Sequence, residues 1–374
     1  MNNINLSKMK KFIKIRIQLL YLIVFTMLLS AISGCGAFSG MQTDGDKITI
    51  VTTIFPIYDW VREITDGSEN VEITLLLDNG TDLHSFQPTA DDLIQIADCD
   101  MFLYVGGESD IWVEDALANA ANQDMVVISL LDALGDQAKE EEIVEGMEAE
   151  HEDGHDHDAH AEEEDPAGED THAEVVDPAG EDAHAEEADP ADEDKPEYDE
   201  HVWLSLKNAD YYCGLIAEKL SILDEKNSEL YAANAQQYRQ QLLSLDQEFQ
   251  AVVDASPIKT ILLGDRFPFR YLTEDYGLDY YAAFSGCSAD SEASFETITF
   301  LAGKVDELDL HTILILESND GKIAQTIRET TTTKNQQILT MDSLQSVSAE
   351  DVANGVTYLS LMKENCRILQ QALQ

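Results

Sequence analysis

Two histidines in this chain are candidates for binding a metal ion. His84 lies in the loop 80–88, and His201 lies in the sequence Asp-Glu-His-Val-Trp at 199–203. Both stand at the ends of predicted elements, where α/β folds bind their ligands. Imidazole is a common ligand of Zn²⁺ and of other divalent transition metals. A lone loop histidine is more often a surface residue, so the assignment depends on the elements that position the pair.

The acidic segment 136–200 could bind metal more loosely. It contains 30 Asp or Glu residues, only two lysines (Lys139 and Lys195), and six of the nine histidines. Such a composition buries too little apolar surface to offset the entropy of ordering, which predicts a disordered, solvated insert. The density of imidazole and carboxylate favours accessory metal chelation over a solubilising linker with incidental histidines. These histidines are His151, His155, His157, His160, His172 and His184.

One sequence in this segment matches a catalytic pattern. Residues 151–155 read His-Glu-Asp-Gly-His, the pattern of zinc proteases. That chemistry requires both histidines on one face of a buried helix, with the glutamate directed at a bound water. The internal Gly154 and the charged flanks argue against such a helix. No glycine-rich phosphate loop or nucleophile elbow is visible either, so we predict that the protein is not an enzyme; a zinc hydrolase is the alternative.

The N-terminal 35 residues have the pattern of an export signal. A lysine-rich start precedes the uncharged apolar stretch 19–29, which is shorter than the roughly 20 residues that a spanning helix needs. The sequence Ala-Ile-Ser-Gly-Cys at 31–35 is similar to the lipobox of bacterial lipoproteins. We therefore expect lipidation of Cys35 and anchoring to the cell membrane on its extracytoplasmic face; the alternative is an uncleaved membrane anchor.

The net charge limits the possible partners, and the cysteine count limits the possible disulfides. The formal net charge is −52, and 30 acids less two lysines place −28 of it in the segment 136–200. This charge excludes nucleic acid as a natural partner. Four cysteines remain after Cys35: Cys99, Cys213, Cys287 and Cys366. In an exported protein these four could pair in three ways, and the sequence does not choose among them.

Apolar runs alternate with amphipathic stretches along the rest of the chain. Strands are predicted at 47–53, 71–77, 101–105, 125–130, 260–264, 279–284, 312–316 and 337–340. Between them we expect helices that begin at Pro56 and span 88–99 and 112–121, and a last helix over 349–373. This alternation is typical of parallel sheets built from βαβ units.

A long helical region separates the two groups of strands. Residues 228–252 contain no Gly or Pro, and apolar side chains recur there at spacings of three and four. We therefore predict an α/β fold with two lobes of mostly parallel sheet flanked by helices, joined by one long rigid helix. The expected divisions are a signal peptide at 1–35, an N-terminal lobe at 36–135, the insert at 136–200, the end of that lobe with the long helix at 201–256, and a C-terminal lobe at 257–374.

Several motifs occur in an order that resembles a known family. The sequence Val-Thr-Thr-Ile-Phe-Pro at 51–56 precedes a Gly-x-Asp-x-His-x-x-x-Pro loop, the acidic histidine-rich insert, Asp-x-His-x-Trp and the long helix. Together they resemble the zinc-binding lipoproteins that supply bacterial metal-uptake ABC transporters. The resemblance covers nearly all of the chain after the signal peptide. Each motif is weak alone, and the combination is specific.

The resemblance implies a metal ion held between the lobes. His84 and His201 match the first two ligand positions of the family, and Asp342 matches a carboxylate position near the last strand. The usual third ligand, a His or Glu after the first strand of the second lobe, is absent. Asp265 is the nearest replacement, because the neighbouring Arg266 is always protonated.

Other uses of these residues remain open. Cys287 or Glu292 could reach the cleft from the next strand end and replace Asp265. Cys287 could instead form a disulfide, Asp342 could cap a helix or turn, and Asp265 could pair with an arginine. Two histidines with carboxylates suit Zn²⁺, and they suit Mn²⁺ better than three histidines would.

The function that the resemblance implies is metal capture for import. We expect a monomeric, lipid-anchored binding protein that captures Zn²⁺, or Mn²⁺, as its transported ligand and delivers it to a cognate ABC permease and its ATPase. The insert would collect metal loosely before transfer to the cleft. The alternative is an extracellular metal-buffering or adhesin lipoprotein on the same scaffold.

Overall fold

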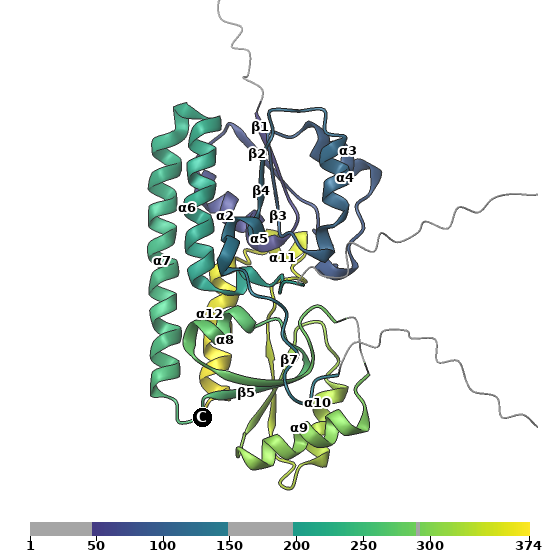
Figure 1. Cartoon of the computed structure of the whole chain (residues 1–374). Coiled ribbons are helices and arrows are strands. Elements are labelled where there is room, and N and C mark those ends of the chain that lie inside the picture. The colour runs from purple at the N-terminus through teal and green to yellow at the C-terminus, as the bar shows by residue number, and fades with distance from the viewer. Residues whose placement is uncertain (1–46, 149–196, 289–291) are drawn as a thin grey trace, which may run out of the picture. The chain divides into compact units, whose positions relative to one another are not determined.

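The computed structural model describes residues 47–148, 197–288 and 292–374. Residues Ile48–Gln374 form one compact unit, which contains two parallel sheets with helices on their faces (Figure 1). The expected two-lobed α/β architecture is confirmed. None of the helices within the described ranges is long and apolar enough to cross a membrane.

The first sheet contains four parallel strands in the order β2-β1-β3-β4. Its strands are β1 (Ile48–Thr52), β2 (Val71–Leu75), β3 (Met101–Tyr104) and β4 (Val126–Ser129). Its helices are α2 (Phe55–Thr65), α3 (Ala90–Asp98), α4 (Trp112–Ala118) and α5 (Leu130–Leu134). Helix α2 buries Ile57, Trp60, Val61 and Ile64, the face that its sequence predicts. Each crossover returns the chain to the same end of the sheet, so the strand-end loops gather along one edge.

The second sheet repeats this plan with the order β6-β5-β7-β8. Its strands are β5 (Thr260–Arg266), β6 (Asp279–Phe284), β7 (Thr312–Leu316) and β8 (Gln337–Met341). Helices α8 (Arg270–Tyr276), α9 (Phe295–Glu307) and α10 (Lys322–Thr330) lie between them along the chain. All four predicted strands of this lobe are present, two of them with the predicted bounds.

Helix α7 (Ser228–Ala255) spans both lobes, after helix α6 (Leu206–Leu223). Its 28 residues correspond to about 42 Å at 1.5 Å per residue. It packs against α6 and α2 on one lobe and against α8 and α12 (Tyr358–Ala372) on the other (Figure 1). Two buried hydrogen bonds add to this link, since Trp203 Nε1 donates to Ser343 O (2.9 Å) and Tyr358 Oη donates to Trp203 O (2.7 Å). Helix α7 and these two hydrogen bonds therefore join the two lobes rigidly.

The structure corrects one predicted helix and shows the state of the cysteines, which the sequence left open. The helix expected over 349–373 is broken into α11 (Ala349–Ala353) and α12, because Gly355 adopts a φ of +91° that continues no helix. The four cysteines Cys99, Cys213, Cys287 and Cys366 are all free.

The described ends of the predicted insert also belong to the fold. Glu140 pairs with Tyr198 in an antiparallel bridge, and Glu148 N donates to Ala283 O (2.9 Å). Residues 139–141 and 197–199 therefore pair with each other, and Glu148 pairs with the second lobe, although the composition of this segment alone predicted a solvated chain. Residues 149–196 lie outside the described ranges.

Candidate metal centre

His84 lies in the short 3₁₀ helix Leu83–Ser85 that follows β2. Asp82 caps this turn, since its Oδ1 accepts a hydrogen bond from His84 N (3.0 Å). The imidazole is mostly buried, with 13% of the side chain exposed. Its Nδ1 lies 2.8 Å from Ser109 Oγ, in the loop after β3. The contact at Nδ1 therefore holds the ring, and Nε2 is the nitrogen that remains available to bind a ligand.

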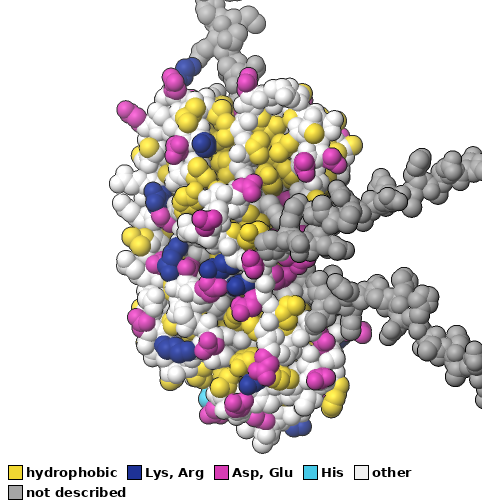
Figure 2. All heavy atoms as spheres, viewed as in Figure 1, with side chains coloured by type: hydrophobic (Ala, Val, Ile, Leu, Met, Phe, Trp, Pro, Cys, Tyr) yellow, Lys and Arg dark blue, Asp and Glu magenta, His cyan; other side chains and the backbone are white. Residues whose placement is uncertain are grey.

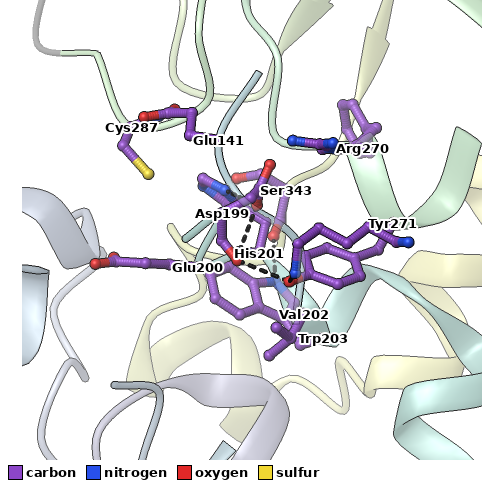
Figure 3. Close-up of polar contacts among 12 residues, drawn as sticks. Glu141, Asp199, Glu200, His201, Val202, Trp203, Arg270, Tyr271, Cys287 and Ser343 are labelled. Carbon is purple, nitrogen blue, oxygen red and sulfur yellow. Dashed lines mark hydrogen bonds and ion pairs between the residues drawn. The ribbon is translucent and has the colours of Figure 1, made fainter. Parts of the chain in front are cut away.

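His201 is fully buried and is held in the same way. Its Nδ1 donates to Asp199 Oδ1 (3.0 Å), and the same oxygen accepts from His201 N (2.8 Å). The backbone oxygen of Asp199 accepts from Tyr271 Oη (3.0 Å), and Tyr271 Oη accepts from Lys139 N (2.9 Å) (Figure 3). The carboxylate of Asp199, whose backbone is held by Tyr271 of α8, therefore orients this imidazole.

The two imidazoles face each other through their Nε2 atoms, which lie 3.3 Å apart. Asp199 can only accept, so Nδ1 of His201 carries the hydrogen and Nε2 presents a lone pair. Two facing nitrogens at this distance need a proton or a cation between them. Two nitrogens bound to one tetrahedral zinc ion at about 2.0–2.1 Å are separated by about 3.4 Å. The observed spacing therefore fits a single shared metal ion.

A third potential ligand comes from the loop after β6. The ligand atoms of His84, His201 and Cys287 all lie within 4.8 Å of one another. In the described part of the chain this is the only group of three or more His, Cys, Asp or Glu residues that meets this criterion. Figure 3 shows Cys287 next to Glu141, with His201 and Glu200 below them. Glu141 Oε1 accepts from Cys287 N (3.0 Å) and so holds this loop.

His84 and Cys287 line a cavity of about 240 Å³. The remaining lining residues include four glutamates: Glu108, Glu141, Glu197 and Glu200. No Lys or Arg is among the lining residues that the structure describes. Carboxylates around a partly enclosed space produce a negative potential that attracts cations. A larger cavity of about 400 Å³ lies between α6 and α7, where Asp210 is already paired with Arg239.

Burial favours the uncharged forms of His84 and Glu200. It lowers the pKa of His84 to about 3, and the charge of His201 acts in the same direction. Burial also raises the pKa of Glu200 to about 7. Glu200 Oε1 accepts from Ser109 N (2.8 Å), whereas the buried Oε2 has no hydrogen-bond partner and lies 3.5 Å from His84 Nδ1. A bound cation would lower the energy of the ionised carboxylate.

Two predicted carboxylate ligands are not brought into this cluster. The oxygens of Asp265 accept from Arg266 N (2.8 Å) and from Leu316 N (2.9 Å), so this carboxylate joins β5 to β7. Asp342 Oδ1 accepts from Leu344 N (2.7 Å) and caps a turn. Burial and the nearby Glu317 raise the pKa of Asp342 to about 7. In both cases a carboxylate oxygen accepts from the backbone, and neither residue belongs to the group whose ligand atoms lie within 4.8 Å of one another.

The remaining predicted site residues are also accounted for. Glu292 is exposed and outside the cluster. Arg266 lies where the family has its third ligand, and its Nη2 forms an ion pair with Asp82 Oδ2 (2.6 Å). This ion pair links β5 to the loop that carries His84. The predicted lipidation site Cys35 and the six histidines of the insert lie outside the described residues.

Four residues of the site were not predicted: Ser109, Glu141, Asp199 and Glu200. Asp199 and Glu200 directly precede His201 in the sequence, and metal-bound histidines commonly donate their second N–H to a carboxylate. That rule could have identified Asp199. Glu141 belongs to the stretch that composition assigned to the insert, so no local signal marked it.

The comparisons with known proteins agree with this fold. The model of the family described as zinc-uptake complex component A, periplasmic, matches residues 50–372. The zinc-binding lipoprotein AdcA of Streptococcus pneumoniae R6 is 28% identical over 334 residues, which cover 88% of this chain and 56% of that protein. The chain thus spans just over half the length of that relative. The high-affinity zinc uptake system protein ZnuA of Bacillus subtilis is 27% identical over 355 residues, covering 95% and 97% of the two chains.

Solved structures show the same architecture. The Zn(II)-bound ZnuA-like domain of S. pneumoniae AdcA has a TM-score of 0.61 at 24% identity, covering 87% of this chain and 99% of that domain. The metal-dependent lipoprotein YcdH of B. subtilis has a TM-score of 0.63 at 22% identity, covering 87% and 99%. At these sequence identities the structural similarity supports the fold alone.

Proposed function

Because the chain belongs to the zinc-uptake complex component A family, we propose that it is the zinc-capturing component of an ABC importer. In this proposal the protein works outside the cytoplasm, binds Zn²⁺ between its lobes and transfers it to a cognate permease driven by an ATPase. The ion is its cargo, and the protein catalyses no reaction. The observation that carries the proposal is the pair of Nε2 atoms of His84 and His201, 3.3 Å apart, with both Nδ1 atoms held by neighbours.

The arrangement of the site supports reversible capture. Both rings are positioned before metal arrives, so little ordering entropy opposes binding. The glutamates of the cavity favour entry of a divalent cation, and the buried carboxylate of Asp199 stabilises the charge that His201 acquires as a ligand. The printed names of the S. pneumoniae and B. subtilis relatives describe zinc binding and zinc uptake, which supports Zn²⁺ as the cargo.

Two further parts of the proposal concern the regions outside the described residues. The sequence at 31–35 supports a lipid anchor at Cys35, which would keep the protein at the membrane near its permease. The histidines of segment 149–196 would hold metal weakly and raise its local concentration. Glu197, the first described residue after this segment, lines the cavity, so the chain returns to the described fold at the site.

The test is zinc titration calorimetry on the protein with the six histidines of the 149–196 segment replaced by alanine. This background should retain one tight site, and His84→Ala or His201→Ala should remove it. His311→Ala is the matched control, because His311 is exposed and contacts the C-terminal residue Gln374. Tight binding of one zinc ion by both the His84 and His201 variants would refute the proposal.

A further inference from the structure

We infer that the thiolate of Cys287 is the third protein ligand, so that the site selects Zn²⁺ and other thiophilic ions over Mn²⁺. This inference rests on the proposed function and specifies its ligand set and cargo class. Cysteine is absent from the ligand set that the family resemblance implies. The inference therefore comes from this chain's own geometry, in which the sulfur and the two imidazoles lie within 4.8 Å of one another.

The loop that carries Cys287 is built against His201. A Cβ atom added to Gly286 would lie 3.1 Å from both Cε1 and Nδ1 of the His201 ring, so the backbone of this loop touches the imidazole. Only glycine allows this approach without displacing the ring. The next residue is Cys287, whose N–H is held by Glu141 (3.0 Å). The sulfur is thus placed beside the imidazole by the close approach of Gly286 and by the hydrogen bond that holds Cys287 N.

The neighbouring strand end offers no competing ligand. Arg266 ends β5 and is paired with Asp82, and both oxygens of Asp265 accept from backbone N–H groups. A guanidinium cannot bind a cation, since it stays protonated. The loop after β6 therefore replaces the loop after β5 as the second lobe's contribution to the site.

Metal binding at this cysteine releases one proton. The S–H bond breaks as the sulfur–zinc bond forms, and the proton leaves to solvent, so that Zn²⁺ replaces H⁺ at sulfur. Glu141 and Glu200 line the cavity together with Cys287, so carboxyl groups lie near the thiol. A divalent ion compensates this charge in a way that a proton cannot.

Sulfur ligation sets the cargo class. Thiolate is a soft ligand that favours Zn²⁺ and Cu⁺, whereas Mn²⁺ prefers carboxylate, carbonyl and water oxygens and binds most weakly of the first-row divalent ions. Two histidines with carboxylates, the set expected from the sequence, would discriminate less between Zn²⁺ and Mn²⁺. Cys287 is therefore the residue that determines specificity.

The experiment compares Cys287→Ser with Cys366→Ser in the background that lacks the six insert histidines. Cys366 is a free thiol in α12 and serves as the matched control. Competition with a chromophoric chelator measures affinity for Zn²⁺ and Mn²⁺ separately. Cys287→Ser should weaken zinc binding by about 100-fold or more, because even loss of a ligand's supporting partner costs about 10- to 100-fold. Its manganese affinity should change by less than about 10-fold.

Cobalt substitution gives a readout that a purely structural role would not change. Co²⁺ bound to the background protein and to the Cys366 variant should show sulfur-to-cobalt charge-transfer absorption, and the Cys287 variant should lack it. Cys287→Asp restores a charged ligand without sulfur and should favour Mn²⁺ relative to the background protein. If the Cys287 variants fail to fold, protection of Cys287 from alkylation by added Zn²⁺ tests the same contact in the unaltered site.

The outcomes separate the two proposals. If His84→Ala abolishes tight zinc binding while Cys287→Ser retains both zinc affinity and the charge-transfer band, Cys287 is not a ligand and the proposed function stands. Absence of zinc protection against alkylation would likewise overturn the inference. If His84 and His201 variants still bind zinc tightly, the proposed function itself fails.

Discussion

Replacing Asp199 with asparagine is expected to weaken zinc binding by about 10- to 100-fold without unfolding the protein. Asp199 Oδ1 lies 3.0 Å from His201 Nδ1, and both side chains are almost completely buried. The amide oxygen of asparagine can still accept from Nδ1 and from His201 N. The variant therefore keeps the orientation of the ring and loses only the negative charge that stabilises it as a ligand.

The magnitude follows from this loss of charge. A 10- to 100-fold change in Kd corresponds to about 1.4–2.8 kcal/mol, the range typical of a carboxylate that supports a metal-bound histidine. The stabilisation that excess zinc gives to the folded protein should fall by the same amount, because binding is linked to unfolding through Kd. The unfolding temperature of the metal-free protein should change little.

Calorimetry and thermal unfolding with and without zinc provide the assay. Asp342→Asn is the control, because Asp342 is a carboxylate at a position that the family resemblance favours but that caps a turn in this structure. Its zinc affinity should remain within about 3-fold of the unaltered protein. The reasoning would be refuted if Asp199→Asn bound zinc as tightly as the parent, or if Asp342→Asn lost as much affinity as Asp199→Asn.

Three further substitutions test the packing against His201, the ion pair of Arg266 and a buried carboxyl group in α2. Gly286→Ala should lower zinc affinity by about 10-fold in calorimetry, because the added methyl group would lie 3.1 Å from the His201 ring and force it to move; unchanged affinity would contradict the close packing. Arg266→Gln should speed zinc dissociation by up to about 5-fold in stopped-flow chelation, since it removes the 2.6 Å ion pair with Asp82 in the loop of the first histidine; an unchanged rate would exclude a positioning role. Burial raises the pKa of Asp59 from its ordinary value of 3.8 to about 6, so the folded protein keeps a proton that the unfolded chain releases between these values. The resulting stability is fully present below about pH 4 and is lost as pH rises through about 6. The free energy of unfolding, measured by urea titration, should therefore fall by about 3 kcal/mol across this range. Asp59→Asn should not show this fall, and an identical pH profile in both proteins would disprove the assignment to Asp59.

The sequence predicted the elements well, because their signals are local. Runs of β-branched and apolar residues identify all eight strands, and the spacing of Tyr231, Tyr238, Leu242 and Phe249 identifies the buried face of α7. The break before α12 was missed, since a single glycine decides it through a positive φ. The two histidines were proposed as ligands from motifs that recur in a family. His84 follows β2 of the first sheet, whereas His201 follows the segment 197–199, which pairs with residues 139–141.

The rest of the site depends on contacts between distant loops. Asp265 and Cys287 were both candidates, and nothing in their neighbouring residues distinguishes a carboxylate that binds Leu316 N from a thiol that faces two imidazoles. Glu141 reaches the site because its segment pairs with residues 197–199 and with the second lobe. The composition of this stretch predicted that it is solvated, because composition averages over residues and contains no information on which backbone groups pair.

The most direct measurement is anomalous diffraction at the zinc absorption edge from crystals of the zinc-loaded protein. We predict one strong anomalous peak in the cavity, about 2.0–2.1 Å from Nε2 of His84 and from Nε2 of His201. A peak that contacts neither histidine, or an empty position between the two rings in zinc-saturated crystals, would contradict a shared metal ion at this site.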